Sequence, residues 1–355
     1  MEDKVIGSAA SRRKRALSRR NISAAVLACA AGLFVLVSLP QGAHADDACT
    51  AVAERITAAR QARDLAALTT SFQEAARPES SCSEKARYCL GRSVALGYVA
   101  EVYAREKKEP GAADAQPGET EGLLTTARTF GAPWQLLVAS ADAHLDRARA
   151  AHDPALYGAA AYDYQLALID LGGDAACLDY GEPTAPTAPQ IGEIYGRMST
   201  ALLLAAPIKI ATTKCSVCQW AFLSGIRNFT PAVRPLPITF ESNRSDPTPE
   251  GRDAIAALLE CLKAQKLPRI VLSGHTDQVG SAAFNKGLSS DRLNAVQRLL
   301  RQGGFAGNIV LEPKGKSEPY GGDGLDGYSE EEVRRLNRRI ELRAFAAGEA
   351  PSCSP

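Results

Sequence analysis

The feature that most constrains the fold is an alternation of strand-like and helix-like apolar patterns in the C-terminal third of the chain. Short apolar or alternating runs predict four strands, at residues 237–240, 269–272, 309–311 and 339–343. Apolar residues at helical spacing lie between these runs, and the expected helices start at Thr248, Ser289 and Ser329. The order β-α-β-α-β-α-β predicts an α+β sandwich, in which helices cover one face of a small mixed sheet.

Within this region one carboxylate and one guanidinium are held apart. Residues 274–280 read Gly-His-Thr-Asp-Gln-Val-Gly, so Asp277 lies on the loop that leaves the second strand. With Ser289 as N-cap, Arg292 would lie in the first turn of the next helix, where free backbone N–H groups also favour an anion. Such a pair suits a zwitterion, with the acid on its ammonium and the arginine on its carboxylate. The alternative is a structural Asp277–Arg292 ion pair without a ligand.

Two further motifs flank this segment. They are Phe240-Glu241-Ser242-Asn243 and Asn337-Arg338-Arg339-Ile340-Glu341. In order and spacing the motifs resemble the OmpA-like C-terminal domain family over residues 237–346. The resemblance implies a domain that binds the diaminopimelate-containing stem peptide of bacterial peptidoglycan. It also implies that Asp277 and Arg292 hold the diaminopimelate, and that five further residues line the groove: Asn243, Thr276, Asn285, Leu288 and Arg338.

The chain departs from the family pattern in two places. Leu293 stands where the family usually has alanine, which should affect packing alone, and the loop 320–328 is longer than usual. We expect this loop to reshape the rim of the pocket. Arg338 and Arg339 alternate along the last strand, so one should face the pocket and the other solvent, whereas Arg334 and Arg335 are expected on a solvated helix face.

Residues 46–207 are alanine-rich and predict an all-α domain. Apolar residues at helical spacing indicate helices at 51–76, from Ser81 or Ser83 to 103, and at 134–151, 155–171 and 191–204. Ala160, Tyr164 and Ala167 are spaced as in the second helix of a tetratricopeptide repeat. Both a repeat-like array of hairpins and a plain helical bundle fit these residues. We expect residues 208–236 to be a linker to the second domain and residues 347–355 to be a tail.

The first 45 residues predict an export signal. Basic residues precede an uncharged apolar segment at 22–39, and Ala43-His44-Ala45 is a cleavage pattern of small residues. Export by the general or the twin-arginine route is compatible with the basic residues. The alternative is an uncleaved anchor in the inner membrane, since 18 apolar residues can just span a bilayer. That architecture resembles flagellar stator subunits, but without the acidic residue that carries their protons.

Cysteine usage agrees with export. Eight cysteines follow the signal, an even number that in an oxidising compartment predicts disulfides. Proximity in the sequence suggests that Cys49 pairs with Cys82 or Cys89. Cys215 and Cys218 form a CxxC motif without a second pair for zinc, so a structural disulfide is expected there.

Charge and motifs together favour a binding protein over an enzyme. Residues after 45 carry 34 basic and 38 acidic side chains, a balance that argues against nucleic acid as a partner. No metal, cofactor or catalytic residue is expected, because the chain has no convincing nucleophile–base pair, paired carboxylates or metal-ligand spacing; His275 should only bond within its turn. We expect a cell-wall anchor in the periplasm, associated with the wall or the outer membrane, whose helical domain docks an unidentified protein; membrane association is left open.

Overall fold

The computed structural model describes residues 47–80, 82–108, 117–172, 177–180, 186–206, 226, 229–241, 243–321 and 325–344. These residues form two compact units. The first consists of residues 1–139 and 174–186, and the second of residues 140–173 and 187–355. The predicted domain boundary after residue 207 therefore lies inside the second unit. The predicted export signal, with its apolar segment 22–39, and the CxxC motif, where a disulfide is expected, lie outside the described residues.

The first unit is helical, as predicted. Its described residues form four helices, a short 3-10 helix and the start of a fifth helix: α2 (Asp47–Ala62), α3 (Leu65–Ala76), α4 (Glu84–Lys108), α5 (Pro117–Arg128), η2 (Leu178–Tyr180) and the first residues of α6 (Trp134–Ala151). The single helix predicted for 51–76 is wrong. Arg63 adopts a left-handed φ of 58°, which ends α2, and the Asp64 carboxylate then caps α3 by accepting from the Ala67 N–H at 2.9 Å.

Two disulfides cross-link the described part of this unit. Cys49 of α2 is bonded to Cys82, which confirms one of the two pairings suggested by the sequence. Cys89 of α4 is bonded to Cys177, directly before η2. Cys261, which belongs to the second unit, is a buried thiol.

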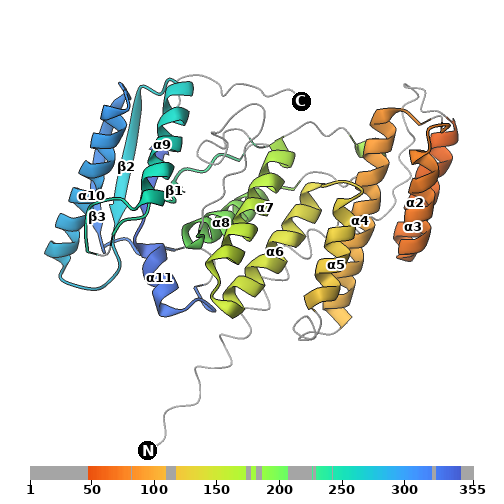
Figure 1. The fold of residues 1–355 in the computed structure, drawn as a ribbon, viewed down its shortest axis with the longest axis horizontal. Helices are drawn as coiled ribbons and strands as arrows, with labels where there is room; N and C mark the ends of the chain where they lie inside the picture. Colours follow the sequence, from red (N-terminus) through yellow and green to blue (C-terminus); the bar gives the residue numbers. More distant parts are fainter. Residues whose placement is uncertain are drawn as a thin grey trace, which may run out of the picture. The chain divides into compact units, whose positions relative to one another are not determined.

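The second unit begins with the rest of α6 and the hairpin of α7 (Pro154–Gly172) and α8 (Ala188–Leu204), which pack along one another (Figure 1). Ala160, Tyr164 and Ala167 of α7 are all fully buried, so the small residues allow close packing as expected. Whether these helices belong to a repeat array stays a prediction. None of the described helices is long and apolar enough to cross a membrane.

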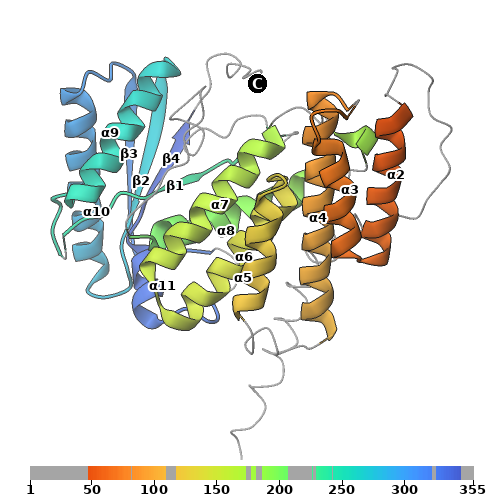
Figure 2. The same ribbon diagram turned by 45° about the vertical axis from the view of Figure 1, so that its right-hand side comes forward.

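The remainder of the second unit is a four-stranded mixed sheet with helices. Its elements are β1 (Arg234–Leu236), α9 (Pro249–Ala264), β2 (Arg269–His275), α10 (Ala282–Gln302), β3 (Asn308–Gly315), α11 (Glu330–Asn337) and β4 (Ile340–Ala344). The strand order is β1-β4-β2-β3, with β2 and β3 parallel and the other pairs antiparallel. The predicted α+β architecture is confirmed, and α9 and α10 lie on one face of the sheet (Figure 2).

The alternation of side chains gives the sheet one apolar and one polar face. Leu272 pairs with Leu311 and Leu342 in the neighbouring strands, and these side chains share the face that α10 covers. Ser273, one residue further, pairs with Glu312 and Glu341 on the opposite face. Burial of the apolar face fixes the register, because a slip of one residue would expose every leucine.

The first strand differs from the prediction. It is Arg234–Leu236, within the expected linker, and residues 237–240 contribute only an isolated bridge between Phe240 and Pro247. Pro235 is accommodated because β1 pairs with β4 alone and so forms the edge of the sheet.

Candidate functional site

Asp277 lies just beyond β2 and is held by two hydrogen bonds. Its Oδ1 accepts from the Val279 N–H at 3.1 Å, and its Oδ2 accepts from Arg338 Nη1 at 3.0 Å. The side chain keeps 17% of its surface exposed. A carboxylate has about four lone-pair directions, so this geometry leaves acceptor capacity towards solvent.

Thr276 and Gly315 fix the loop that carries this acid. The Thr276 N–H donates to the Gly315 carbonyl at 2.9 Å, and the Thr276 side chain is buried. Gly315 has a φ of 58°, and a Cβ there would lie 3.0 Å from the Lys286 nitrogen of α10. The glycine therefore lets the end of β3 approach the helix closely.

Arg292 is a buried cation on α10 and is 3% exposed. Its Nε donates to the Arg244 carbonyl at 3.0 Å, and its guanidinium lies 4.9 Å from the centre of the Phe240 ring. Among the described residues no carboxylate lies within ion-pair distance of it. Burial first, and then the charge of Arg338, lowers the pKa of Arg292 to about 10 against a smaller opposing effect of Asp277.

The structural Asp277–Arg292 ion pair is therefore not formed. Asp277 instead pairs with Arg338, whose second terminal nitrogen bonds to Glu331 of α11. These two acids raise the pKa of Arg338 even though burial acts to lower it. Asp277 thus has an ion-pair partner within the domain, whereas the Arg292 guanidinium bonds to a backbone carbonyl and lies against the Phe240 ring.

The prediction that Ser289 caps the helix is wrong. Helix α10 starts at Ala282, and Ser281 is its N-cap, accepting from the Phe284 N–H at 3.2 Å. Ser289 lies in the third turn, fully buried, where its hydroxyl accepts from the Gly315 N–H at 3.1 Å. The helix N-terminus accordingly supplies neither backbone donors nor dipole to a ligand at Arg292.

The other predicted residues surround these two charges. Asn285, 2% exposed, donates from Nδ2 to the Val279 carbonyl at 2.8 Å and so ties the Asp277 loop to α10. Asn243 adopts a left-handed φ of 53°. Asn243 and Leu288 both line a hollow of about 410 Å³ between the 243–246 turn and α10. The same turn provides the carbonyl that holds Arg292.

Sequence reasoning missed the direct neighbours of Arg292. Phe240 was noted only as part of a motif, although its ring lies against the guanidinium. The carbonyl of Arg244 leaves no trace in the sequence, because any residue has one. Glu331 was not singled out in the sequence, although it shares Arg338 with Asp277.

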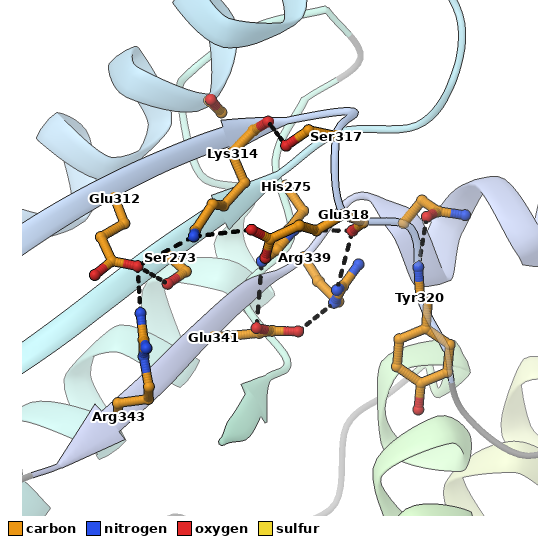
Figure 3. A network of polar contacts seen from close by, with 12 residues as sticks. Ser273, His275, Glu312, Lys314, Ser317, Glu318, Tyr320, Arg339, Glu341 and Arg343 are labelled. Atoms are coloured by element: carbon orange, nitrogen blue, oxygen red, sulfur yellow. Dashed lines mark hydrogen bonds and ion pairs between the residues drawn. The ribbon is translucent and has the colours of Figure 1, made fainter. Parts of the chain in front are cut away.

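The polar face of the sheet carries a separate network (Figure 3). His275, 1% exposed, places Nδ1 3.2 Å from the Glu318 carbonyl and Nε2 3.3 Å from Glu341. Arg339 is 5% exposed and donates to Glu341 at 2.7 Å, so the prediction that it faces solvent is wrong. Burial acts to raise the pKa of Glu341, but the bonds from His275 and Arg339 lower it to about 2. Arg339 and Glu341 thus form an ion pair within this network.

Arg335 and the two described ends of the long loop contact helices of the same unit. Tyr320 and Tyr328, at the two described ends of the loop, bond to Thr200 of α8 and Arg149 of α6 rather than reaching the candidate site. Arg335 donates to the Ala205 carbonyl at 2.9 Å and is therefore not on a solvated face. The physical reason is shared: these side chains pack against helices that the sequence places more than a hundred residues away.

Taken by its chemistry, the site offers groups of both charges to a ligand. It presents a partly exposed carboxylate, a buried guanidinium and a neighbouring hollow lined by polar and apolar groups. Within the described ranges no group of three or more His, Cys, Asp or Glu side chains is arranged to hold a metal.

Comparison with known proteins confirms the resemblance given by the motifs. Residues 239–338 match the OmpA family. Over 105 residues the chain is 36% identical to the peptidoglycan-associated lipoprotein of Pseudomonas aeruginosa, a match that covers 29% of this chain and 59% of that protein. It is 33% identical over 104 residues to outer membrane protein A of Bordetella avium, covering 29% and 51% of the two chains.

Among solved structures, the chain is similar to that of the peptidoglycan-associated lipoprotein from Burkholderia pseudomallei. It is 23% identical, covers 30% of this chain and 88% of its own, and has a TM-score of 0.27. The chain spans between half and two thirds of the length of the two curated relatives.

Proposed function

With residues 239–338 forming an OmpA family domain, we propose that this protein is a non-catalytic anchor that binds the diaminopimelate residue of peptidoglycan. The names of two relatives, peptidoglycan-associated lipoproteins of Pseudomonas species, support a wall ligand. Diaminopimelate carries an ammonium and a carboxylate on one carbon at the end of its side chain. The candidate site offers one group for each.

The observation that carries the proposal is Arg292. A buried guanidinium without an ion-pair partner among the described residues is costly, because burial penalises its charge. A ligand carboxylate would supply the missing partner, and Arg is suited to grip it with two parallel hydrogen bonds. The Nε of Arg292 is already used by the Arg244 carbonyl, so the two terminal nitrogens are assigned to the ligand.

Asp277 is assigned to the ammonium of the same zwitterion. Its contact with Arg338 holds the carboxylate in place. Thr276 and Asn285 position the loop that carries it. Asn243 and Leu288, on the walls of the hollow, are assigned to the adjoining part of the stem peptide.

The rest of the chain fits an exported anchor. We propose that residues 1–45 direct export, that the helical region 46–207 docks a protein partner, and that residues 237–346 hold the wall from the periplasmic side. The sacculus presents its ligand densely, so even a modest affinity per site retains the protein through rebinding.

The test compares two soluble muropeptides by calorimetry. One carries diaminopimelate, and the other carries lysine, which lacks the second carboxylate. We expect the lysine form to bind at least about 30-fold more weakly, since leaving one charge of such a pair unmatched costs about 2–5 kcal/mol. Equal affinity for both peptides, or no binding to either, contradicts the assignment of Arg292.

Two controls complete the experiment. Arg298→Met removes the same charge from the exposed side of α10 and should leave the affinity unchanged, whereas Arg292→Met should abolish the preference for diaminopimelate. Dye-labelled sacculi incubated with the protein should release no dye. Release would indicate a hydrolase and refute the non-catalytic assignment.

A further inference from the structure

Helix α11 connects the candidate wall site to the α6–α8 helices within the second unit. Glu332 lies in the N-terminal turn of α11, and its carboxylate accepts four polar contacts. Two come from the N–H and hydroxyl of Ser329 at 2.6 and 2.8 Å and complete a capping box. The other two come from α7 and its preceding turn: the Tyr157 hydroxyl at 2.7 Å and His152 Nδ1 at 2.9 Å.

Three more contacts surround the contact between Glu332 and α7. The Tyr328 ring lies 4.7 Å from the Arg149 guanidinium, which also donates to its hydroxyl at 2.7 Å. The Tyr320 hydroxyl lies 2.7 Å from the Thr200 hydroxyl of α8. Arg335, in the last turn of α11, donates to the Ala205 carbonyl. Both ends of α11 are therefore fastened to the same helical layer.

The C-terminal end of α11 leads to the site. The Arg338 N–H closes the helix on the carbonyls of Arg334 and Arg335, and its guanidinium then reaches Asp277. Arg338 follows Glu332 by six positions, which is a distance of ~9 Å along a helix. A helix of eight residues has little stability of its own, so its position depends on what it packs against.

We propose that the Tyr157–Glu332 contact positions Arg338 against Asp277, so that the α7 helix and the diaminopimelate site are energetically coupled. Tyr157 and Glu332 are positioning residues, because neither touches the candidate site itself. This inference rests on the proposed function. It gives the helical layer a role beyond docking: any partner that displaces α7 from α11 weakens the grip on the wall, and wall binding in turn stabilises the α7–α11 contact.

The geometry makes Tyr157 the informative position. The residue is 1% exposed, and its ring stacks on that of Tyr328 at a centroid distance of 6.2 Å. Burial and the bond to Glu332 raise the pKa of Tyr157 well above its ordinary value, so the phenol stays a donor at neutral pH. Tyr157→Phe deletes the donor while it keeps the ring, and the capping box of α11 remains intact.

The control is Tyr164→Phe, the same substitution two turns later on α7. Tyr164 is also fully buried and donates to Asp142 of α6, and among the described residues no hydrogen bond, ion pair or ring contact joins it to α11. Both variants lose one buried hydroxyl and should lose similar stability. Only Tyr157→Phe should weaken binding of the diaminopimelate muropeptide, by about fivefold, the lower end of typical coupling between sites. Tyr164→Phe should stay within about twofold of the unsubstituted protein.

A second readout needs no ligand. The side-chain NMR signal of the Arg338 guanidinium should shift in Tyr157→Phe and not in Tyr164→Phe, because only the first loosens α11. If Tyr157→Phe does not fold, Thr200→Val removes the parallel contact to Tyr320 and takes its place.

The outcomes separate the two proposals. No binding by the unsubstituted protein refutes the proposed function, while the Arg338 signal still decides the positioning role. Normal binding by the unsubstituted protein together with equal affinities of both variants overturns the coupling alone. Equal loss in both variants also overturns it, because that result reports general destabilisation.

Discussion

Replacing Arg292 with methionine separates a functional buried charge from a structural one. At neutral pH the folded protein holds this cation although burial lowers its pKa from 12.5 to about 10. At 1.36 kcal/mol per pKa unit, the charge costs the folded state about 3 kcal/mol. The cost is present below pH 10 and is relieved as the pH rises from about 10 towards 12.5, because the folded state releases the proton first.

Methionine removes this cost but also removes two favourable contacts. The hydrogen bond to the Arg244 carbonyl is worth about 1.5–3 kcal/mol, and the contact with the Phe240 ring about 1 kcal/mol. The side-chain volume is largely kept, so no large cavity forms. The terms nearly cancel, and the free energy of unfolding should change by less than about 1.5 kcal/mol.

Two measurements check this balance. Urea unfolding followed by circular dichroism gives the change in stability, and calorimetry with the diaminopimelate muropeptide gives the change in affinity, expected to be at least about 30-fold. Breaking a structural buried ion pair would instead destabilise the fold by about 3–5 kcal/mol. A loss of that size with the affinity unchanged would refute the reasoning.

Three other expectations follow from the contacts described. The pKa of Glu341 is lowered from 4.5 to about 2, so its stabilisation, on the order of 3 kcal/mol, is present above pH 4.5 and lost as the pH falls through 2; acid unfolding of Glu341→Gln should lack this dependence. Replacing both Cys89 and Cys177 with alanine should destabilise the first unit by about 1 kcal/mol more than replacing both Cys49 and Cys82. The reason is that the Cys89–Cys177 bond closes a loop of 88 residues and the Cys49–Cys82 bond a loop of 33. Thermal unfolding of the two variants without reductant measures the difference. Ser281→Ala should lower the free energy of unfolding in urea by about 1 kcal/mol, because Ser281 only caps α10. Ser289→Ala should lower it by more, because loss of the buried hydroxyl leaves the Gly315 N–H without an acceptor. The reverse order of the two losses would contradict the observed start of α10.

The local pattern of residues determined most of the elements. Thr248 caps α9 with Pro249 behind it, and Ser329 caps α11, because these caps use only atoms within the same turn. Strand β2 is likewise visible in the sequence, since a buried strand needs an uninterrupted apolar run. The end of this strand also predicted that Asp277 lies on the loop that follows β2.

Nonlocal partners decided what the sequence left open. Ser289 reads as a cap because serine usually caps, but β3 brings the Gly315 N–H to it, and this lets the helix continue past it. Arg339 alternates like a solvated residue, yet pairing of β2 with β4 sets it beside Glu341 and His275 in a buried network. Residue spacing reports only on neighbours along one element, so it is silent about contacts made across a sheet.

The sequence by itself determined that the acid, Asp277, and the guanidinium, Arg292, lie at the two ends of one segment that consists of a loop and part of a helix. Only the tertiary structure decided that Asp277 is held by Arg338 and that Arg292 keeps a backbone carbonyl and a ring as its partners. The reason is physical: Arg338 reaches Asp277 across 61 residues because α11 is packed against the α7–α8 hairpin, and no local pattern records that packing.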